Sequence, residues 1–371
     1  MTSAHSFDPF ADGENIVPLL TARMPRPKML TLRSPGELVD MTFGDDDIIL
    51  GDRLLAEGQS LVIAAAGGTG KSRLLLQLAA SVVSGLDFVG LPTQGEGKRW
   101  LILQTENSNR RLQQDLRNIF RWLDADEWAA FNEQVRIHTL ESESDGFVNL
   151  DSLENLALLE ATIEECQPDI IAVDPLNEFA IGDLNKDCDM RATLSTLTQV
   201  CRRGNHKRAL IVLHHAITGR AGAAKATGFD RASFGRNSKS LHAWARGQIN
   251  LAAASAEDNR QLVVSCGKTS NGREFAPFAI ALSDSGIYEP DNSVDIAAWA
   301  ADMAGTARNA PLMTPERVAE LCAVPMEKAE LATLIREDCG CGRASAYRYV
   351  KRAETARKLR FNSTTGHYTR K

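Results

Sequence analysis

The decisive stretch of the sequence is Ala65-Ala66-Gly67-Gly68-Thr69-Gly70-Lys71-Ser72. An apolar segment with the length of a strand, residues 61–65, leads into it, and residues 72–84 follow it with apolar positions at helical spacing. Glycines allow consecutive backbone N–H groups to curl around a phosphate without Cβ clashes, and the start of a helix adds partial positive charge. The stretch therefore predicts a phosphate-binding loop between a strand and a helix.

The end of this loop carries the residues that would contact a nucleotide. Lys71 can reach the β and γ oxygens of a triphosphate, and Ser72 can ligate Mg²⁺. Ala65 stands where the motif usually has its first glycine, but that position needs less conformational freedom than Gly70, so we expect the loop to form. The alternative is a chance glycine-rich turn, which the Gly-Lys-Ser ending and the strand–loop–helix order disfavour. The predicted nucleotide-binding residues of the loop are Ala66, Gly67, Gly68, Thr69, Gly70, Lys71, Ser72 and Arg73.

Two carboxylates follow predicted strands and are candidates for the same site. Asp174 ends the apolar run 170–173, at the edge where ligands bind in open α/β sheets. An Asp can end any strand, but beside a phosphate-binding loop Asp174 is a candidate Mg²⁺ ligand. Glu106 follows a strand at residues 100–104. If that strand neighbours the loop strand, Glu106 faces the γ-phosphate and orients the attacking water; the alternative is an acid that complements a helix dipole.

Two adjacent histidines, His214 and His215, lie at the end of another predicted strand, residues 210–214. A histidine in this place can donate a hydrogen bond to the γ-phosphate. Neighbouring residues of a strand point to opposite faces, so at most one of the two is expected to face the nucleotide. The alternatives are a pair of structural histidines or metal ligands.

Strands and helices alternate from residue 54 onward, and this alternation predicts an α/β fold with a parallel sheet covered on both faces. Residues 217–240 are rich in Gly, Ala, Ser and basic residues and predict a mobile loop. Three later strands, 248–252, 261–266 and 278–282, are expected as antiparallel additions to the sheet edge. The earlier predicted strands are 61–65, 100–104, 135–138, 170–174 and 210–214, and the predicted helices are 72–84, 109–122, 150–166 and 191–203.

Composition excludes several classes of protein. With 43% hydrophobic and 24% charged residues among 371, the chain has the balance of a globular protein and not of a disordered or fibrous one. No apolar run reaches the ~18 residues that span a bilayer, and the N-terminus shows no secretory signal. The seven cysteines are scattered and odd in number, so reduced thiols in a cytoplasmic protein are expected, without a membrane partner.

Four parts follow from these patterns: an N-terminal arm at 1–40, a nucleotide-binding core at 41–285, a linker at 286–312 and a C-terminal domain at 313–371. Residues 341–371 carry nine Lys or Arg and one acid, a net charge of +8, whereas residues 1–340 sum to −14. A basic module on an acidic protein indicates contact with a polyanion.

The C-terminal domain has the pattern of a small winged helix-turn-helix domain. Thr314 and Pro315 begin a first helix, residues 326–337 form a second, and a third starts near Ser345. The third helix has an apolar stripe and an opposite basic stripe, and residues 358–371 predict two short strands that would form a wing. The alternative is a solvated basic helix in a small bundle. The candidate DNA-binding residues are Arg348, Lys351, Arg352 and Lys358.

The order of the motifs resembles one family. Gly-Gly-Thr-Gly-Lys-Ser at 67–72, Gln-Thr-Glu at 104–106, Ile-Ile-Ala-Val-Asp-Pro at 170–175 and Val-Leu-His-His-Ala at 212–216 are similar to the RecA-fold ATPases of the plasmid RepA-type hexameric replicative helicases, often called AAA_25. The resemblance covers about residues 40–285. It implies a RecA-like P-loop NTPase core that uses ATP and Mg²⁺.

The resemblance also implies roles for single residues. Lys71 and Ser72 match the Walker A pair, Asp174 the Walker B acid, Glu106 the catalytic glutamate and His215 the γ-phosphate sensor. The stretch 237–246 resembles the segment with the arginine finger, which implies Arg246, with Arg236 as the competitor; Lys268 lies in a stretch that resembles the following hairpin and could reach a neighbour's nucleotide. A finger supplied in trans implies a homo-oligomeric ring, with a hexamer favoured.

The expected function is an ATP-driven DNA helicase of the replicative type, acting in plasmid, phage or mobile-element replication. Single-stranded DNA would pass through the ring along the basic stretch 220–239, and the C-terminal domain would bind duplex DNA or a replication partner. The first alternative is a DNA-binding replication accessory in which ATP only switches assembly. A second alternative is a KaiC-like or recombinase-like filament.

Overall fold

The computed structural model describes residues 31–42, 44–45, 47–141, 148–217, 219–235, 239–255, 258–307, 313–339, 342–363 and 365–371. The chain divides into two compact units, Met1–Asp45 and Asp46–Lys371. In the described part of the first unit, α1 (Pro35–Val39) starts at a capping box in which Ser34 and Glu37 exchange hydrogen bonds. Residues 1–30 of the predicted N-terminal arm lie outside the described residues, and the predicted domain boundaries stay a prediction.

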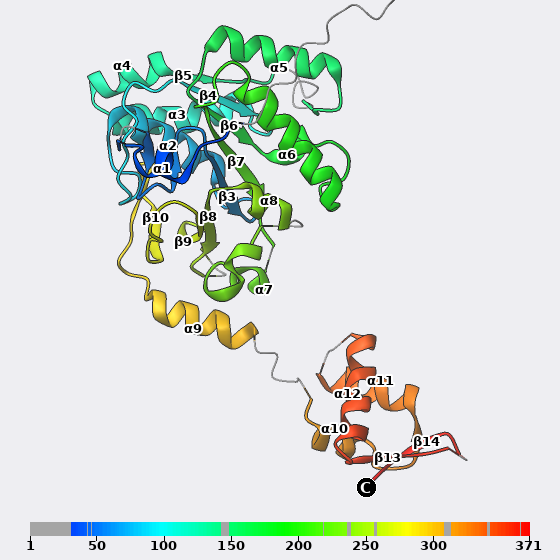
Figure 1. The fold of residues 1–371 in the computed structure, drawn as a ribbon. Coiled ribbons are helices and arrows are strands. Elements are labelled where there is room, and N and C mark those ends of the chain that lie inside the picture. Colours follow the sequence, from blue (N-terminus) through cyan, green and yellow to red (C-terminus); the bar gives the residue numbers. More distant parts are fainter. Residues whose placement is uncertain are drawn as a thin grey trace, which may run out of the picture. The chain divides into compact units, whose positions relative to one another are not determined.

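A nine-stranded sheet forms the centre of the second unit, in the order β11-β10-β9-β8-β3-β7-β6-β4-β5 (Figure 1). The six strands from β8 to β5 are parallel, and β9, β10 and β11 extend one edge antiparallel. A separate antiparallel pair joins β1 (Ile48–Leu50) to β2 (Leu55–Ala56). The nine strands are β3 (Ser60–Ala65), β4 (Trp100–Gln104), β5 (Val135–Ile137), β6 (Ile170–Asp174), β7 (Ala209–His215), β8 (Gly247–Ala253), β9 (Gln261–Thr269), β10 (Phe278–Leu282) and β11 (Tyr288–Pro290).

Helices pack on both faces of this sheet because its central strands are apolar on both sides. In β3, Leu61, Ile63 and Ala65 belong to one buried cluster and Val62 and Ala64 to the other, as strand alternation requires. The first cluster lies under α2 (Lys71–Ser84), α3 (Asn109–Trp122) and α4 (Ala125–Gln134). The second lies under α5 (Leu153–Cys166), α6 (Asp187–Arg202), α8 (Lys239–Trp244) and α9 (Ile296–Ala307).

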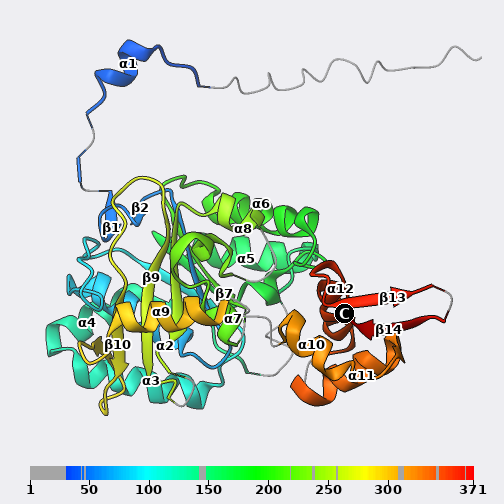
Figure 2. The same ribbon diagram turned by 90° about the horizontal axis from the view of Figure 1, so that it is seen from below.

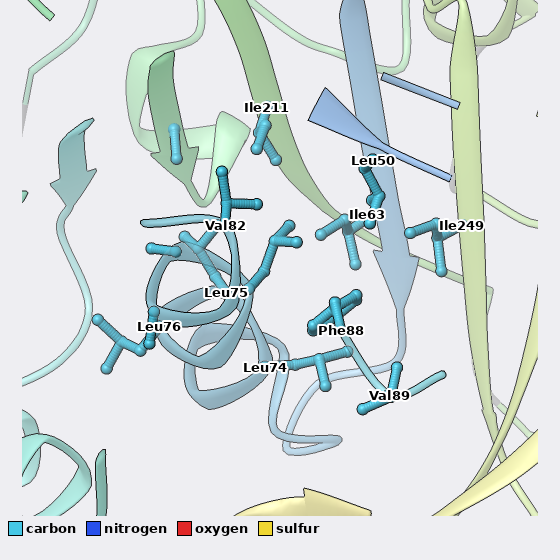
Figure 3. Packing of buried hydrophobic residues seen from close by; sticks show 14 of the residues in the cluster. Leu50, Ile63, Leu74, Leu75, Leu76, Val82, Phe88, Val89, Ile211 and Ile249 are labelled. Carbon is cyan, nitrogen blue, oxygen red and sulfur yellow. The ribbon is translucent and has the colours of Figure 1, made fainter. Parts of the chain in front are cut away.

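Figure 3 shows how the helix after the loop packs on the first face of the sheet. Leu74 and Leu75 of α2 point toward the strands that carry Ile63 and Ile249. In this view Phe88 lies between Leu74 and Ile63. Each of these five side chains is buried. This packing fixes the first turn of α2 against β3 and so determines the shape of the loop between them.

The structure corrects three details of the predicted architecture. Strand β8 is parallel to β3, not antiparallel, whereas β9 and β10 are antiparallel as expected. Strand β4 does not neighbour β3, because β7 and β6 lie between them. In the described part of the predicted loop 217–240, the chain forms α7 (Arg220–Ala223), a 3₁₀ turn at Gly228–Ser233 and the start of α8. Helix α4 was not predicted at all.

The C-terminal residues have a buried core of their own. Thr314 caps α10 (Pro315–Leu321) by accepting a 3.1 Å hydrogen bond from the Arg317 N–H. The strand β12 (Met326–Glu327) and the helices α11 (Lys328–Cys339) and α12 (Arg343–Thr355) follow, then a hairpin of β13 (Leu359–Asn362) and β14 (His367–Arg370) that packs on α12 (Figure 2). Strand β12 pairs with β14 and completes a small sheet.

Within the described ranges, no helix combines the length and the apolar composition that crossing a bilayer requires.

Candidate nucleotide-binding site

The glycine-rich stretch forms a tight bend between β3 and α2. Gly68 and Gly70 have φ of +73° and +86°, a region that residues with a Cβ rarely adopt. The Thr69 hydroxyl donates a 2.7 Å hydrogen bond to the Ala66 carbonyl and closes the bend. Gly70 is the N-cap of α2 and offers no side chain to the N–H groups of the first turn. Those N–H groups and the positive end of the helix dipole are therefore available to an anion.

The Lys71 ammonium lies inside this bend. Its Nζ donates to the carbonyl oxygens of Ala65 at 3.3 Å and Ala66 at 3.0 Å, and it lies 3.4 Å from Nδ1 of His215. Burial lowers the pKa of Lys71, and the nearby carboxylates of Asp174 and Glu106 oppose that shift. A cation held by carbonyl oxygens within the bend can turn toward a phosphate with little change in the backbone.

Asp174 reaches the same place from the end of β6. Its side chain is 2% exposed and accepts a hydrogen bond from the Ser72 hydroxyl. Burial, assisted by the negative charge of Glu106, raises the pKa of Asp174 to about 6. A hydroxyl and a carboxylate oxygen side by side at a helix start are hard ligands of the kind that Mg²⁺ prefers, so the pair fits the predicted metal role.

Glu106 lies near His215, although β4 is not adjacent to β3. After β4, the Thr105 N–H and hydroxyl both bind the Asp174 carbonyl, at 3.0 and 3.3 Å, so the chain bends over the end of β6. Oε1 of Glu106 thereby comes within 3.8 Å of Nε2 of His215. The nearby imidazole of His215 lowers the pKa of this half-exposed carboxylate. The two strands are not neighbours, but the loop after β4 brings Glu106 to the site all the same.

The two histidines separate as strand alternation predicts. His215 contacts both Lys71 and Glu106, whereas His214 is 2% exposed and its ring lies near Gly235. Strand β7 therefore brings His215 to Lys71 and Glu106, although both histidines line one polar cavity. That at most one of them faces a nucleotide stays a prediction.

Arg73 belongs to a network that sequence reasoning missed. Its Nε lies 3.0 Å from Oδ1 of Asp115 on α3, and the other oxygen of that carboxylate lies 2.9 Å from Nε of Arg111. Asp115 is 4% exposed, so it is a buried acid shared by two arginines next to the loop. Its spacing of four residues from Arg111 was the one local signal, and that spacing also occurs in ordinary surface ion pairs.

Two of the predicted site residues lie far from the loop. The Arg246 N–H donates to the carbonyl of Ser60, the first residue of β3, whereas the loop follows the last residue of that strand, Ala65. Lys268 is paired with Gln248, and its Nζ donates to the His242 carbonyl at 2.7 Å.

The backbone of Arg246 therefore lies about 17 Å along β3 from the loop, and Lys268, whose partner Gln248 is level with Val62, lies about 10 Å along it. The competing residue, Arg236, lies outside the described residues.

Two cavities adjoin the loop. One, of about 490 Å³, is lined mostly by polar groups and includes His215, Asn177 and Asp183. The other, of about 600 Å³, borders Ala66 and Thr69 and is mostly apolar. His215 and the half-exposed Glu106 are therefore accessible from outside the protein, whereas Lys71 and Asp174 are buried.

The candidate DNA-binding residues of the C-terminal part differ in their surroundings. Arg348, Lys351 and Arg352 are exposed on α12, whose opposite side buries Ala346, Val350 and Ala353. Lys358 is exposed as well, but its Nζ lies 3.2 Å from a carboxylate oxygen of Glu316. The helix thus has the predicted apolar and basic stripes, and Lys358 is the one of the four that is engaged in an ion pair with an acid.

Residues 47–221 match the family model AAA_25, described as an AAA domain. The matched segment contains the loop and the cluster of Lys71, Glu106, Asp174 and His215, and it ends before Arg246 and Lys268. The match and the mixed, largely parallel sheet support a P-loop ATPase core of the RecA type, as the sequence predicted. The family resemblance to RepA-type helicases in particular stays a prediction.

No curated protein matches the chain. Among solved structures, the chain is similar to a KaiC-like protein from the hyperthermophilic archaeon Pyrococcus horikoshii OT3, with 13% sequence identity and a TM-score of 0.42. The alignment covers 64% of this chain and 91% of that one.

Proposed function

We propose that this protein is an ATP-hydrolysing, DNA-interacting P-loop ATPase of the RepA-like replicative helicase type that works as a ring. The observation that carries the proposal is the convergence of Lys71, Glu106, Asp174 and His215 on the glycine-rich bend. These four side chains come from four different elements, and together they supply a cation, an ionised carboxylate, a metal ligand and a hydrogen-bond donor. That is the set which hydrolysis of a nucleoside triphosphate requires.

Each of these residues would have its own role in the hydrolysis of ATP. The N–H groups of the bend and Lys71 bind the phosphates, and Glu106 orients and polarises the attacking water. His215 lies between Lys71 and Glu106, so a γ-phosphate that draws Lys71 away changes the hydrogen bonding of this histidine. Mg²⁺, held by Ser72 and Asp174, neutralises phosphate charge when it is bound.

The direction of the parallel strands supports assembly of several copies of the chain into a ring. Arg246 lies toward the end of β3 that is opposite to the loop. We propose that neither Arg246 nor Lys268 acts on the nucleotide of its own chain. A head-to-tail contact would bring this end of one copy against the loop of the next, and repeated contacts of that kind close into a ring. Arg246 would then stabilise the transition state in trans. A homo-hexamer is the assembly that we propose.

The basic stripe of α12 supports contact with DNA. Arg348, Lys351 and Arg352 form an exposed positive surface on a helix whose other side is buried, the arrangement of a recognition helix in a winged helix-turn-helix domain. The hairpin of β13 and β14 takes the place of the wing. We assign duplex DNA to this domain and single-stranded DNA to the ring interior.

An ATPase assay with and without single-stranded DNA tests the motor. The proposal expects Mg²⁺-dependent ATP hydrolysis that single-stranded DNA accelerates, and strand displacement on a forked duplex that requires ATP. The absence of ATP binding would overturn the ATPase proposal, and slow hydrolysis without displacement would overturn the helicase proposal.

A second candidate function is a DNA-binding replication accessory in which ATP switches assembly only. The separate core of the C-terminal part favours it, because a basic domain with its own buried centre can bind DNA without a motor. The two candidates differ in strand displacement, which the accessory lacks. Electron microscopy of the assembled particle separates a closed ring from a filament.

A further inference from the structure

Tyr288 lies behind the glycine-rich bend. It is the first residue of β11 and is 3% exposed, and its hydroxyl donates a hydrogen bond of 3.3 Å to the carbonyl of Thr69. Its ring also fills the space beside Gly70, where an added Cβ would collide with the hydroxyl oxygen. Tyr288 and Thr69 are 219 positions apart in the sequence, so the contact is made by the fold and not by local chain geometry.

The orientation of one peptide plane follows from this contact. In a trans peptide the C=O and the N–H point in opposite directions. The Thr69 carbonyl points to the Tyr288 hydroxyl, so the N–H of the same peptide, which belongs to Gly70, points away from Tyr288. N–H groups on the inner side of such a bend are the ones that cradle phosphates.

Tyr288 itself is held in place from α2. The side chain of Gln77 pairs with both backbone groups of Tyr288: Nε2 donates to its carbonyl at 2.8 Å, and Oε1 accepts from its N–H at 2.9 Å. Gln77 is 2% exposed, so both bonds are shielded from water. Two buried hydrogen bonds from α2, the helix that follows the bend, thus hold the backbone of Tyr288 where its hydroxyl meets Thr69.

We infer that Tyr288 is a positioning residue for the nucleotide site: its hydroxyl holds the Thr69 carbonyl outward so that the Gly70 N–H is preset to bind a phosphate of the nucleotide. The inference rests on the proposed function and assigns to the same site a residue that lies outside the matched segment 47–221. The inference predicts that nucleotide binds more weakly when the hydroxyl is lost. The peptide bond between Thr69 and Gly70 must then be oriented at the time of binding, and this ordering lowers the affinity.

The test is Tyr288→Phe in the full-length protein, which removes the hydroxyl and keeps the ring. Titration with fluorescent N-methylanthraniloyl ADP is expected to show binding about three- to tenfold weaker, the range for one neutral hydrogen bond. The KM for ATP should rise by the same factor while kcat stays within about twofold, because the Gly70 N–H binds the phosphate equally in the ground and transition states. The melting temperature of the nucleotide-free protein should fall by only a few degrees, the cost of one buried hydrogen bond.

Tyr368→Phe is the matched control. Tyr368 is also buried, and its hydroxyl makes a 3.4 Å contact with Glu354 in the C-terminal part. Its substitution should leave ADP affinity and KM unchanged. Equal ADP affinity in wild type and Tyr288→Phe would overturn the inference alone, as would an affinity loss accompanied by a fall in melting temperature much larger than one hydrogen bond explains. If wild-type protein bound neither ADP nor ATP, the proposed function would be lost together with this inference.

Discussion

Oε1 of Glu106 and Nε2 of His215 lie 3.8 Å apart, although their strands, β4 and β7, are separated by β6. The other ring nitrogen of His215 faces Lys71, so the histidine connects the carboxylate that would orient water with the ammonium that would bind phosphate. In the proposed ATPase, this connection would let the site register whether a γ-phosphate is present.

Replacement of Glu106 by glutamine keeps the shape of the side chain and removes its negative charge. We expect hydrolysis of ATP to fall by about 100-fold or more, with the Kd for ATP within a few-fold of wild type. Single-turnover hydrolysis and equilibrium nucleotide binding measure the two quantities. Glu133→Gln, a change at an exposed glutamate of α4, is the control and should leave both unchanged. Wild-type turnover in Glu106→Gln would remove this residue from the reaction.

Arg246→Ala is expected to spare nucleotide binding and to lower turnover, whereas Lys71→Ala is expected to abolish hydrolysis. If the arginine acts on the neighbouring copy, a mixture of the two variants contains interfaces with an intact loop and an intact arginine. An equimolar mixture should then regain activity at about one quarter of its interfaces.

Steady-state ATPase assays of each variant and of the mixture measure this complementation. Arg121→Ala, a change at an exposed arginine of α3, should behave as wild type. A mixture no more active than the sum of its components would argue against action in trans.

Asp174 makes the nucleotide-free protein sensitive to pH. Its pKa of about 6 lies above the usual value of 3.8, so the folded state binds this proton more tightly than the unfolded chain. The free energy of unfolding therefore falls as the pH rises from about 4 to about 6, and the ionised carboxylate costs about 3 kcal/mol above that range.

Asp174→Asn removes that ionisation. The variant should melt at a higher temperature than wild type at pH 8, with a smaller difference at pH 5, while its hydrolysis is lost. Thermal denaturation without nucleotide measures the first effect, and Asp151→Asn, at an exposed position, is the control. A difference in melting temperature that is the same at both pH values would refute the electrostatic explanation.

The basic stripe of α12 can be tested through the salt dependence of DNA binding. The double change Lys351→Ala and Arg352→Ala should weaken binding of duplex DNA and reduce the slope of log K against log salt by about 2 if both residues contact phosphates. Lys358→Ala should have a smaller effect, since Lys358 already forms an ion pair with Glu316. Fluorescence anisotropy at several salt concentrations gives the slopes, and Arg336→Ala on α11 is the control. An unchanged slope in the double variant would exclude this surface.

The sequence was most informative where a signal is local. The glycine-rich bend, the apolar strands 61–65 and 170–174 and the helix 109–122 could be predicted from spacing alone, and the structure has elements there within about one residue. The alternation of His214 and His215 also follows from strand geometry. These features depend on neighbouring residues only.

What could not be predicted depends on contacts between distant segments. The order of the strands decides whether Glu106 reaches the site, and it does so through the hydrogen bonds of Thr105 to Asp174, which no pattern in the sequence indicates. Strand β8 has the same alternating composition whether it pairs parallel or antiparallel. Tyr288 carries no signal of its own, because its role arises only when β11 packs behind the bend.

The late position of Tyr288 has a consequence for how the protein is made. The phosphate-binding bend leaves the ribosome more than 200 residues before the tyrosine that supports it. A nascent chain, or a truncated product that stops near residue 221, would contain every motif of the matched segment and still lack that support. Full affinity for nucleotide should therefore arise only after synthesis has passed residue 288.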